Sequence, residues 1–294
     1  MPPVRKLSIS GAQRKATLAV IFFTAVAMLA FAANSLLARM ALLTTTIDAA
    51  SFTTIRIVSG AVVLYAILIA QRQKMRVSGI GALSAFLLFV YAAAFSFAYR
   101  DISTGAGALI LFATVQLVMI SWGLHKGERA HVPGLLLALG GLVVFLAPGV
   151  SAPPLFASAL MALSGIAWGG FSLLGKSGES PTAGTASSFV LAVPMALAMM
   201  LIQRNSLQLD PAGITLALLS GAITSGLGYV IWYWVRVRLA AISAGAVQLS
   251  VPVISAILGV LILNEEISLR SALAAVAVLA GIALVTLSAR RQPK

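Results

Sequence analysis

The sequence predicts an all-α integral membrane protein with ten transmembrane helices, arranged as two inverted-topology repeats of five helices each. Three observations lead to this fold class: the composition, the length of the apolar runs, and internal repetition. The chain has 294 residues, of which 60% are hydrophobic and 9% charged, and its mean hydropathy is +1.04. Because soluble domains carry about a quarter charged residues, a lipid bilayer is the expected solvent for most of this chain.

A helix needs about 20 residues to cross a hydrocarbon layer roughly 30 Å thick, and the sequence contains ten apolar runs near this length. In order, they cover residues 17–40, 51–70, 79–98, 103–124, 132–147, 154–175, 186–202, 211–235, 241–263 and 269–288. The first run is too long for the apolar part of a signal peptide and lacks a clear cleavage site, so we expect it to remain as a span. The short connections leave no room for a soluble domain.

The charged residues lie almost entirely between the runs, and their distribution predicts the orientation. Successive gaps between the runs lie on alternate sides of the membrane. The gaps on the outer side contain only Arg39, Arg100, Arg204 and Arg270. The other side has Arg5, Lys6, Arg14, Lys15, Arg72, Lys74, Arg76, Lys126, Arg129, Lys176, Arg236, Arg238, Arg290, Arg291 and Lys294. The positive-inside rule therefore predicts a multi-pass protein of the inner membrane with both termini in the cytoplasm. This topology accounts for the net charge of +13, so we expect no nucleic-acid partner.

The eighth run ends in an unusually ring-rich segment, GYVIWYWVRVR at residues 228–238. Aromatic side chains gather at the headgroup level, and arginines just beyond them hold that end inside. This role accounts for Trp234, Arg236 and Arg238. Tyr229 lies deeper in the run, where we expect it to face a cavity.

Two short patterns recur at nearly one spacing. FAANSLLAR at residues 31–39 is repeated as WGGFSLLGK at 168–176, displaced by 137 residues, and ISTGA at 102–106 is repeated as ISAGA at 242–246, displaced by 140. Each half then has five runs, and because five is odd, the second half enters the membrane from the opposite face. Such inverted repeats place a transport site between the halves and allow alternating access to it.

Longer segments carry a resemblance to a known family. They are TIRIVSGA around Arg56, GERAHVPGLLLALGGLVVFL at 127–146, QLSVPVISAILGVLILNEE at 248–266 and NEEISLRSALAAVAVLAGIAL at 264–284. The chain resembles the drug/metabolite transporter (DMT) superfamily, specifically its ten-helix EamA-repeat members, and looks most like the YddG-type exporters of amino acids, including aromatic ones. The resemblance implies two EamA repeats, at residues 1–150 and 151–294. The fourth run departs from the pattern, since FATVQ at 112–116 stands where the second half has Pro252.

Polar residues inside a membrane are costly and usually face the interior of a bundle, so each is a candidate for function. The candidates are Asn34, Arg56, Gln116 and Gln248. Arg56 could extend to the outer interface, pair with Asp48, or bind a carboxylate of the substrate. The other three could equally link helices by hydrogen bonds, at about 1 kcal/mol each.

Aromatic residues could form the rest of the site. Tyr91, Phe95 and Tyr99 follow one face of the third run at four-residue spacing, and Trp168 lies within the sixth run between two glycines. Lipid-facing rings or an interfacial belt are the alternative, with Tyr99 nearest the outer interface. The predicted substrate-binding residues are Asn34, Arg56, Tyr91, Phe95, Tyr99, Gln116, Trp168, Tyr229 and Gln248. Pro252 is expected to interrupt the ninth helix about midway and act as a hinge.

None of the seven carboxylates lies near the middle of a run, although a proton-coupled pump normally carries a buried Asp or Glu. We therefore expect a neutral or zwitterionic cargo, most simply amino acids, and facilitated or weakly ion-coupled export. A broad efflux carrier for lipophilic compounds would have a similar ring-lined site and stays open. A nucleotide-sugar carrier would need more basic residues than Arg56 in its cavity.

An intramembrane enzyme is the remaining class to weigh. It would need a nucleophile with a base, paired carboxylates or a metal cluster. The chain has no cysteine, and its two histidines, His125 and His131, flank one short loop. We therefore expect no enzyme activity, no catalytic residues, no metal and no cofactor. Besides the small-molecule substrate, membrane lipids are the expected contacts, and the protein is expected to be a monomer.

Overall fold

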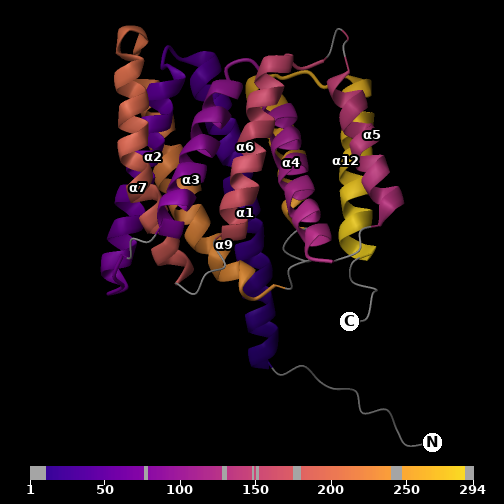
Figure 1. Cartoon of the computed structure of the whole chain (residues 1–294), viewed down its shortest axis with the longest axis horizontal. Helices are drawn as coiled ribbons and strands as arrows, with labels where there is room; N and C mark the ends of the chain where they lie inside the picture. Colours follow the sequence, from indigo (N-terminus) through magenta and orange to yellow (C-terminus); the bar gives the residue numbers. More distant parts are fainter. Residues whose placement is uncertain are drawn as a thin grey trace, which may run out of the picture.

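The computed structural model describes residues 11–75, 79–127, 131–147, 149, 152–174, 180–239 and 247–288, which form helices and no strand. The helices are α1 (Gly11–Thr44), α2 (Ala49–Ala70), α3 (Gly79–Ala98), α4 (Thr104–His125), α5 (Val132–Leu146), α6 (Leu155–Leu174), α7 (Pro181–Ile202), η1 (Arg204–Ser206), α8 (Pro211–Leu218), η2 (Leu219–Leu227), α9 (Gly228–Arg236), α11 (Ser250–Leu263) and α12 (Leu269–Ser288). They stand side by side, and α1 begins at the same end of the bundle at which α12 ends (Figure 1).

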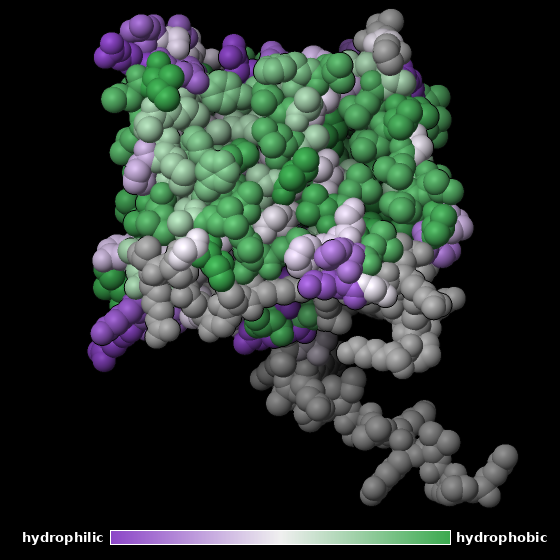
Figure 2. All heavy atoms as spheres, viewed as in Figure 1, coloured by the Kyte–Doolittle hydropathy of each residue, from purple (hydrophilic) through white to green (hydrophobic). Residues whose placement is uncertain are grey.

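The surface suits a hydrocarbon layer. Within the described ranges, seven helices are long and apolar enough to cross a membrane, and Val132–Leu146, Ser250–Leu263 and Leu269–Val285 are shorter apolar helices. Figure 2 shows hydrophobic residues covering the middle of the visible face and hydrophilic ones gathered at its two edges. Large side chains such as Leu155 and Ile202 are 79% and 83% exposed, which water would penalise and lipid does not. The prediction of a multi-pass, all-helical membrane protein is confirmed.

The predicted runs match the helices closely, although some bounds differ. The third and tenth runs have the bounds of α3 and α12, whereas α7 begins at Pro181, before the predicted start at 186. Pro194 lies inside α7. The ISAGA pattern at 242–246 lies outside the described residues, as do Arg5, Lys6, Arg76, Arg129, Lys176, Arg290, Arg291 and Lys294.

The eighth run contains a nine-residue π-helix, η2, between α8 and α9. At its end the backbone N–H of Gly228 donates to the carbonyl of Ile223, five residues earlier. A π-helix is rarer than an α-helix and commonly marks a functional site, because it shifts the faces of the residues that follow. No periodicity in the sequence indicated it.

The helices pair in a regular pattern. Helix α6 packs against α3 and α4, and α1 packs against η2, α9 and α11. Helix α7 packs against α3, and α2 packs against η2, while the pairs α2 with α7, α4 with α11 and α5 with α12 also contact each other. The contacts of α6 with α3 and α4 resemble those of α1 with α9 and α11.

The α5 and α12 pair stands at one side of the bundle (Figure 1) and is held by small residues. A Cβ on Gly281 would lie 2.6 Å from the carbonyl oxygen of Gly134 and inside contact distance of the Ala138 backbone. Such small-residue contacts let two helix backbones approach closely without water as a driving force. The small residues of α5 and α12 therefore pack these two helices together within one chain.

At the end of the bundle where α1 ends, three residues form the Glu265 cluster: Arg39, Thr104 and Glu265. Glu265, between α11 and α12, accepts hydrogen bonds from the Thr104 backbone N–H at 2.8 and 3.0 Å and from Arg39 Nε at 3.3 Å. Arg39 Nη1 donates to the carbonyls of Tyr99 and Arg100 at 2.9 and 2.7 Å. The carboxylate also faces the positive N-terminus of α4. One side chain thus joins α1, the start of α4 and the α11–α12 connection.

Two further carboxylates join other connections at this end. Asp48 caps α2 and accepts from the Gln208 N–H at 2.8 Å, whereas Asp210 caps α8 through Gly213 at 2.9 Å and accepts from the Thr46 N–H at 3.1 Å. Each carboxylate therefore caps its own helix and holds the connection before the other helix. Together they tie the α1–α2 and α7–α8 connections.

We predict that Glu265→Ala lowers the stability of the protein in detergent by about 2 kcal/mol, because it removes a charged acceptor from Thr104 and Arg39. Thermal unfolding followed by circular dichroism measures the change. Glu266→Ala is the matched control, since the neighbouring Glu266 is exposed. Equal melting temperatures for the two variants would contradict the role of the cluster.

Stability should also fall in acid through Asp210. The N–H of Gly213 holds the pKa of this carboxyl below its ordinary value of 3.8. A lowered pKa means that the ionised group stabilises the fold above that value, and that this contribution disappears as the pH falls through the folded pKa. We predict that Asp210→Asn, which keeps an acceptor but cannot titrate, loses less stability than the wild type between about pH 6 and about pH 3. Melting curves across this range, with exposed Asp101→Asn as control, test it; parallel wild-type and Asp210→Asn curves would refute it.

Candidate functional site

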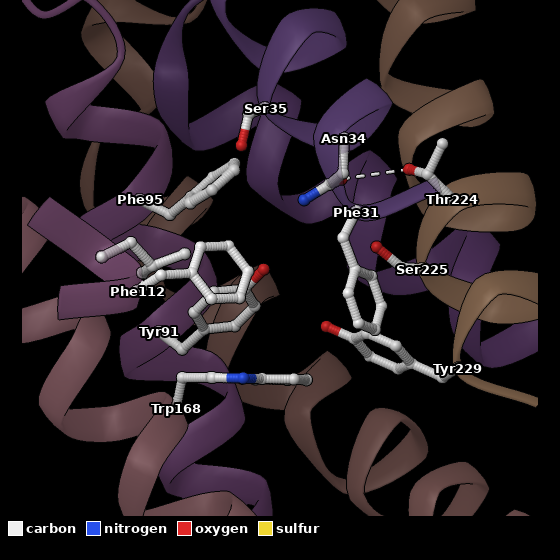
Figure 3. Close-up of a pocket in the computed structure, with 11 residues that line it drawn as sticks. Phe31, Asn34, Ser35, Tyr91, Phe95, Phe112, Trp168, Thr224, Ser225 and Tyr229 are labelled. Atoms are coloured by element: carbon white, nitrogen blue, oxygen red, sulfur yellow. Dashed lines mark hydrogen bonds between the residues drawn. The ribbon is translucent and has the colours of Figure 1, made fainter. Parts of the chain in front are cut away.

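A small buried cavity lies where α1, α3, α4, α6, η2 and α9 meet (Figure 3). All of its lining residues are buried, and its volume is about 20 Å³, close to the room that one water molecule needs. It is lined by Phe31, Asn34, Ser35, Tyr91, Phe95, Leu111, Phe112, Trp168, Thr224, Ser225 and Tyr229. A larger molecule can bind there only when the surrounding helices move apart.

Aromatic rings form a continuous wall around this cavity. The ring centroid of Trp168 lies 4.9 Å from that of Tyr91 and 5.1 Å from that of Tyr229, and Phe31 lies 5.9 Å from Tyr229. These contacts link α3, α6, α9 and α1. Ring pairs at such distances contribute about 0.5–1.5 kcal/mol each beyond burial, and their faces attract apolar groups and ammonium ions.

Asn34 and Ser35 are the polar residues of α1 that line the cavity, and Asn34 has the larger polar group. Its Oδ1 accepts hydrogen bonds from Ser220 Oγ at 2.7 Å and Thr224 Oγ1 at 3.1 Å, both in the π-helix. With the oxygen so occupied, the amide nitrogen points toward the middle of the cavity (Figure 3). Asn34 thus joins α1 to η2 and offers N–H donors to a bound molecule.

Arg56 is the largest fully buried side chain among the described residues, at 1% exposure. Its Nη2 donates to the Tyr91 hydroxyl at 2.8 Å and its Nε donates to Ser225 Oγ at 3.3 Å. The guanidinium carbon also lies 5.1 and 4.8 Å from the ring centroids of Tyr91 and Phe95. The side chain therefore neither extends to the interface nor pairs with Asp48, two alternatives that the sequence left open. Each of these contacts is with a residue that lines the cavity.

The approach of α2 to the π-helix makes this arrangement possible. A Cβ on Gly221 would lie 2.2 Å from the backbone oxygen of Arg56 and 2.0 Å from Ser59 Oγ. Gly60 faces Gly221 from α2, where a Cβ would lie 3.2 Å from the Gly221 oxygen. Two glycines therefore bring the backbones together, so that Arg56 reaches Ser225 across the seam.

The predicted site residues divide into those near the cavity and those away from it. Asn34, Tyr91, Phe95, Trp168 and Tyr229 line it, and Arg56 contacts its wall.

The other three do not line it. Tyr99 is fully buried, its ring packs on Phe95 at 4.6 Å, and its hydroxyl donates to the Thr104 carbonyl at 3.3 Å. Gln116 is buried one turn beyond Phe112 on α4, and Gln248 is half-buried before α11.

Pro252 lies close to a break between two helical segments of the ninth run, residues 247–248 and α11. The helical hydrogen bonding is already interrupted at Leu249, and α11 begins at Ser250, so Pro252 lies in the first turn. A proline costs little there, because the first-turn N–H groups have no partner within the helix. Any hinge at this point thus depends on the break at Leu249, and the hinge itself stays a prediction.

Six lining residues were not predicted as site residues: Phe31, Ser35, Leu111, Phe112, Thr224 and Ser225. The repeat offered a signal for the first, because Phe31 and Trp168 occupy matching positions 137 residues apart. Tyr91 and Tyr229, both in the cavity wall, are likewise 138 apart. The hydroxyl residues of η2, Thr224 and Ser225, had no such signal in the repeat.

The two histidines lie at helix ends, His125 at the end of α4 and His131 before α5. His131 caps α5, accepting from the Gly134 N–H at Nδ1 over 3.1 Å, and His125 is exposed beside Trp122. In the part of the chain that the structure describes, no three His, Asp or Glu side chains lie close enough to hold a metal ion.

Comparisons with known proteins point in one direction. A model of the EamA-like transporter family matches residues 155–287. An uncharacterized protein of Pseudomonas aeruginosa is 49% identical over 268 residues, covering 90% of this chain and 93% of that protein. An uncharacterized transporter of Archaeoglobus fulgidus is 27% identical over 206 residues, covering 66% and 71%. One crystal structure has a TM-score of 0.65 at 18% identity, covering 93% of this chain and 99% of that one, so it shares the fold.

We predict that Gly221→Ala destabilises the protein by about 1–3 kcal/mol, because the added methyl group overlaps the α2 backbone at Arg56. Gly140→Ala is the control, since a Cβ there meets nothing within 4 Å and alanine favours a helix by up to about 1 kcal/mol. Thermal unfolding in detergent compares the two. A Gly221→Ala protein as stable as Gly140→Ala would show that the close approach of α2 and η2 is not required.

Proposed function

We propose that this chain, whose residues 155–287 match the EamA-like transporter family, carries neutral or zwitterionic amino acids, aromatic ones included, across the cytoplasmic membrane by alternating access. The transporter role follows from the family and from the multi-pass helical fold. The ring-lined cavity where helices of both halves of the chain meet is the observation that carries the choice of cargo.

We further propose that residues 1–150 and 151–294 form two inverted five-helix repeats. The pairing of the helices supports this, because α6 with α3 and α4 corresponds to α1 with α9 and α11. The matched ring positions in the cavity wall support it too. In an inverted repeat, rocking one half against the other opens a shared site to each side in turn. The small buried cavity then corresponds to a state between the two openings.

The lining of the cavity favours an amphiphilic cargo. Phe31, Phe112, Trp168 and Tyr229 offer an apolar surface, and Asn34 adds polar donors on one side. A few placed polar groups in an apolar wall are typical of small-molecule sites. An amino acid with a large side chain would present an apolar group and a polar end to these two surfaces.

The proposed coupling and topology follow the same lines. Asp48, Asp101, Asp210, Glu265 and Glu266, the carboxylates in the described ranges, lie at helix ends, so we propose facilitated or weakly coupled export. The common end at which α1 begins and α12 ends supports an even number of crossings, with both termini in the cytoplasm. We propose a monomer in the inner membrane.

A broad efflux carrier for lipophilic compounds is the second candidate, because the wall of rings would accept such molecules as well. Competition separates the two candidates. Proteoliposomes loaded with labelled phenylalanine are challenged with amino acids or with a lipophilic cation such as tetraphenylphosphonium. Inhibition by the cation alone would favour the second candidate.

We predict that Trp168→Ala lowers phenylalanine exchange in proteoliposomes about tenfold, since it removes the ring that contacts both tyrosines of the wall. Trp122→Ala is the matched control, because Trp122 is 47% exposed and does not line the cavity. Initial rates of counterflow without an imposed gradient measure the effect. Wild-type exchange in Trp168→Ala would refute the assignment of the site.

A further inference from the structure

The charge on Arg56 has no counter-ion among the described residues. Its Nη1 is buried without a hydrogen-bond partner, while its other nitrogens donate to neutral hydroxyl groups. Arginine stays protonated in proteins, and a buried charge that lacks an opposite charge is costly. The rings of Tyr91 and Phe95 offset only part of that cost. The positive charge of Arg56 is therefore not balanced by a negative charge in the described part of the site.

The Tyr91 hydroxyl connects Arg56 to the cavity. Because Tyr91 accepts a hydrogen bond from Arg56 Nη2, its own proton is available to another acceptor. Figure 3 shows the Tyr91 oxygen and the Asn34 amide nitrogen both pointing toward the middle of the cavity. A donor polarised by a cation forms a stronger hydrogen bond with an anion than a neutral donor does.

We propose that the cavity recognises the carboxylate of its cargo through the Tyr91 hydroxyl and the Asn34 amide, with Arg56 as the buried counter-charge behind them. A carboxylate has two oxygens for these two donors, and its charge offsets that of Arg56. The inference rests on the proposed function, because it names the part of an amino acid that the site selects. The ring wall then receives the apolar side chain.

Arg56 also links this recognition to the seam of the protein. It lies on α2 and holds Tyr91 on α3 and Ser225 on the π-helix at the same time. A carboxylate that accepts from Tyr91 attracts the guanidinium behind it toward the cavity, and this changes the contact of Arg56 with Ser225. Binding thereby acts on the contact between α2 and η2, the pair that must separate if the cavity is to open.

Three related probes test the proposal: phenylalanine, 3-phenylpropionate, which lacks the ammonium group, and phenethylamine, which lacks the carboxylate. Binding to the purified protein is followed by tryptophan fluorescence, since Trp168 lines the cavity, and exchange is followed in proteoliposomes. We expect the wild type to bind the two carboxylates about 10- to 100-fold more tightly than phenethylamine, the range for a charged hydrogen bond.

Arg56→Met and Tyr91→Phe should each abolish this difference. Met replaces the buried charge with an apolar chain, which buried sites commonly tolerate. Tyr91→Phe provides a second variant that leaves Arg56 in place. Tyr65→Phe is its control, because Tyr65 is 47% exposed on the same helix as Arg56.

The outcomes distinguish a failure of carboxylate recognition from a failure of the proposed amino-acid transport. Equal binding of all three probes, binding of none, or unchanged discrimination in both variants would overturn carboxylate recognition, even if exchange continued. Selective binding of carboxylates without any exchange would support the recognition and overturn the proposed transport of amino acids.

Discussion

In a hydrocarbon layer, no water replaces a hydrogen bond that a protein leaves unmade, and this constraint governs the molecule. Backbone groups are satisfied within helices, so the chain is a bundle of them. Helices surrounded by lipid gain little from burying apolar side chains, so they associate where small residues permit close contact. The glycines between α5 and α12, and between α2 and η2, show the result. The same constraint makes each buried polar side chain informative.

The polar residues of the core gather around the π-helix. Asn34 binds the hydroxyls of Ser220 and Thr224, and Arg56 binds that of Ser225. An α-helix would also place Ser220 and Thr224 on one face, whereas the π-helix brings Ser225 closer to that face. The unusual winding thus lets one short segment contact α1 and α2 at once. It lies beside the cavity, where the two halves of the chain meet.

Charge is distributed differently at the end of the bundle and in its core. At the end where α1 finishes, Asp48, Asp210 and Glu265 cap helices and join connections, so their negative charges are matched by N–H donors or by Arg39. In the core, the contacts of Arg56 with other described residues are with hydroxyl groups and rings. The first arrangement closes one end of the structure. In the core, Arg56 lacks a counter-charge in the described part of the chain, and a negatively charged group on a bound molecule would supply it.

The sequence by itself determined the class of protein and the positions of its helices, because apolar runs of membrane-spanning length have few alternatives. It also indicated Asn34, Tyr91 and Trp168, since polar and aromatic residues within such runs are uncommon enough to stand out. Only the tertiary structure decided that Tyr99 packs away from the cavity and that Arg56 turns inward to Ser225. Those outcomes depend on the π-helical winding and on contacts between residues far apart in the chain, and local patterns contain neither.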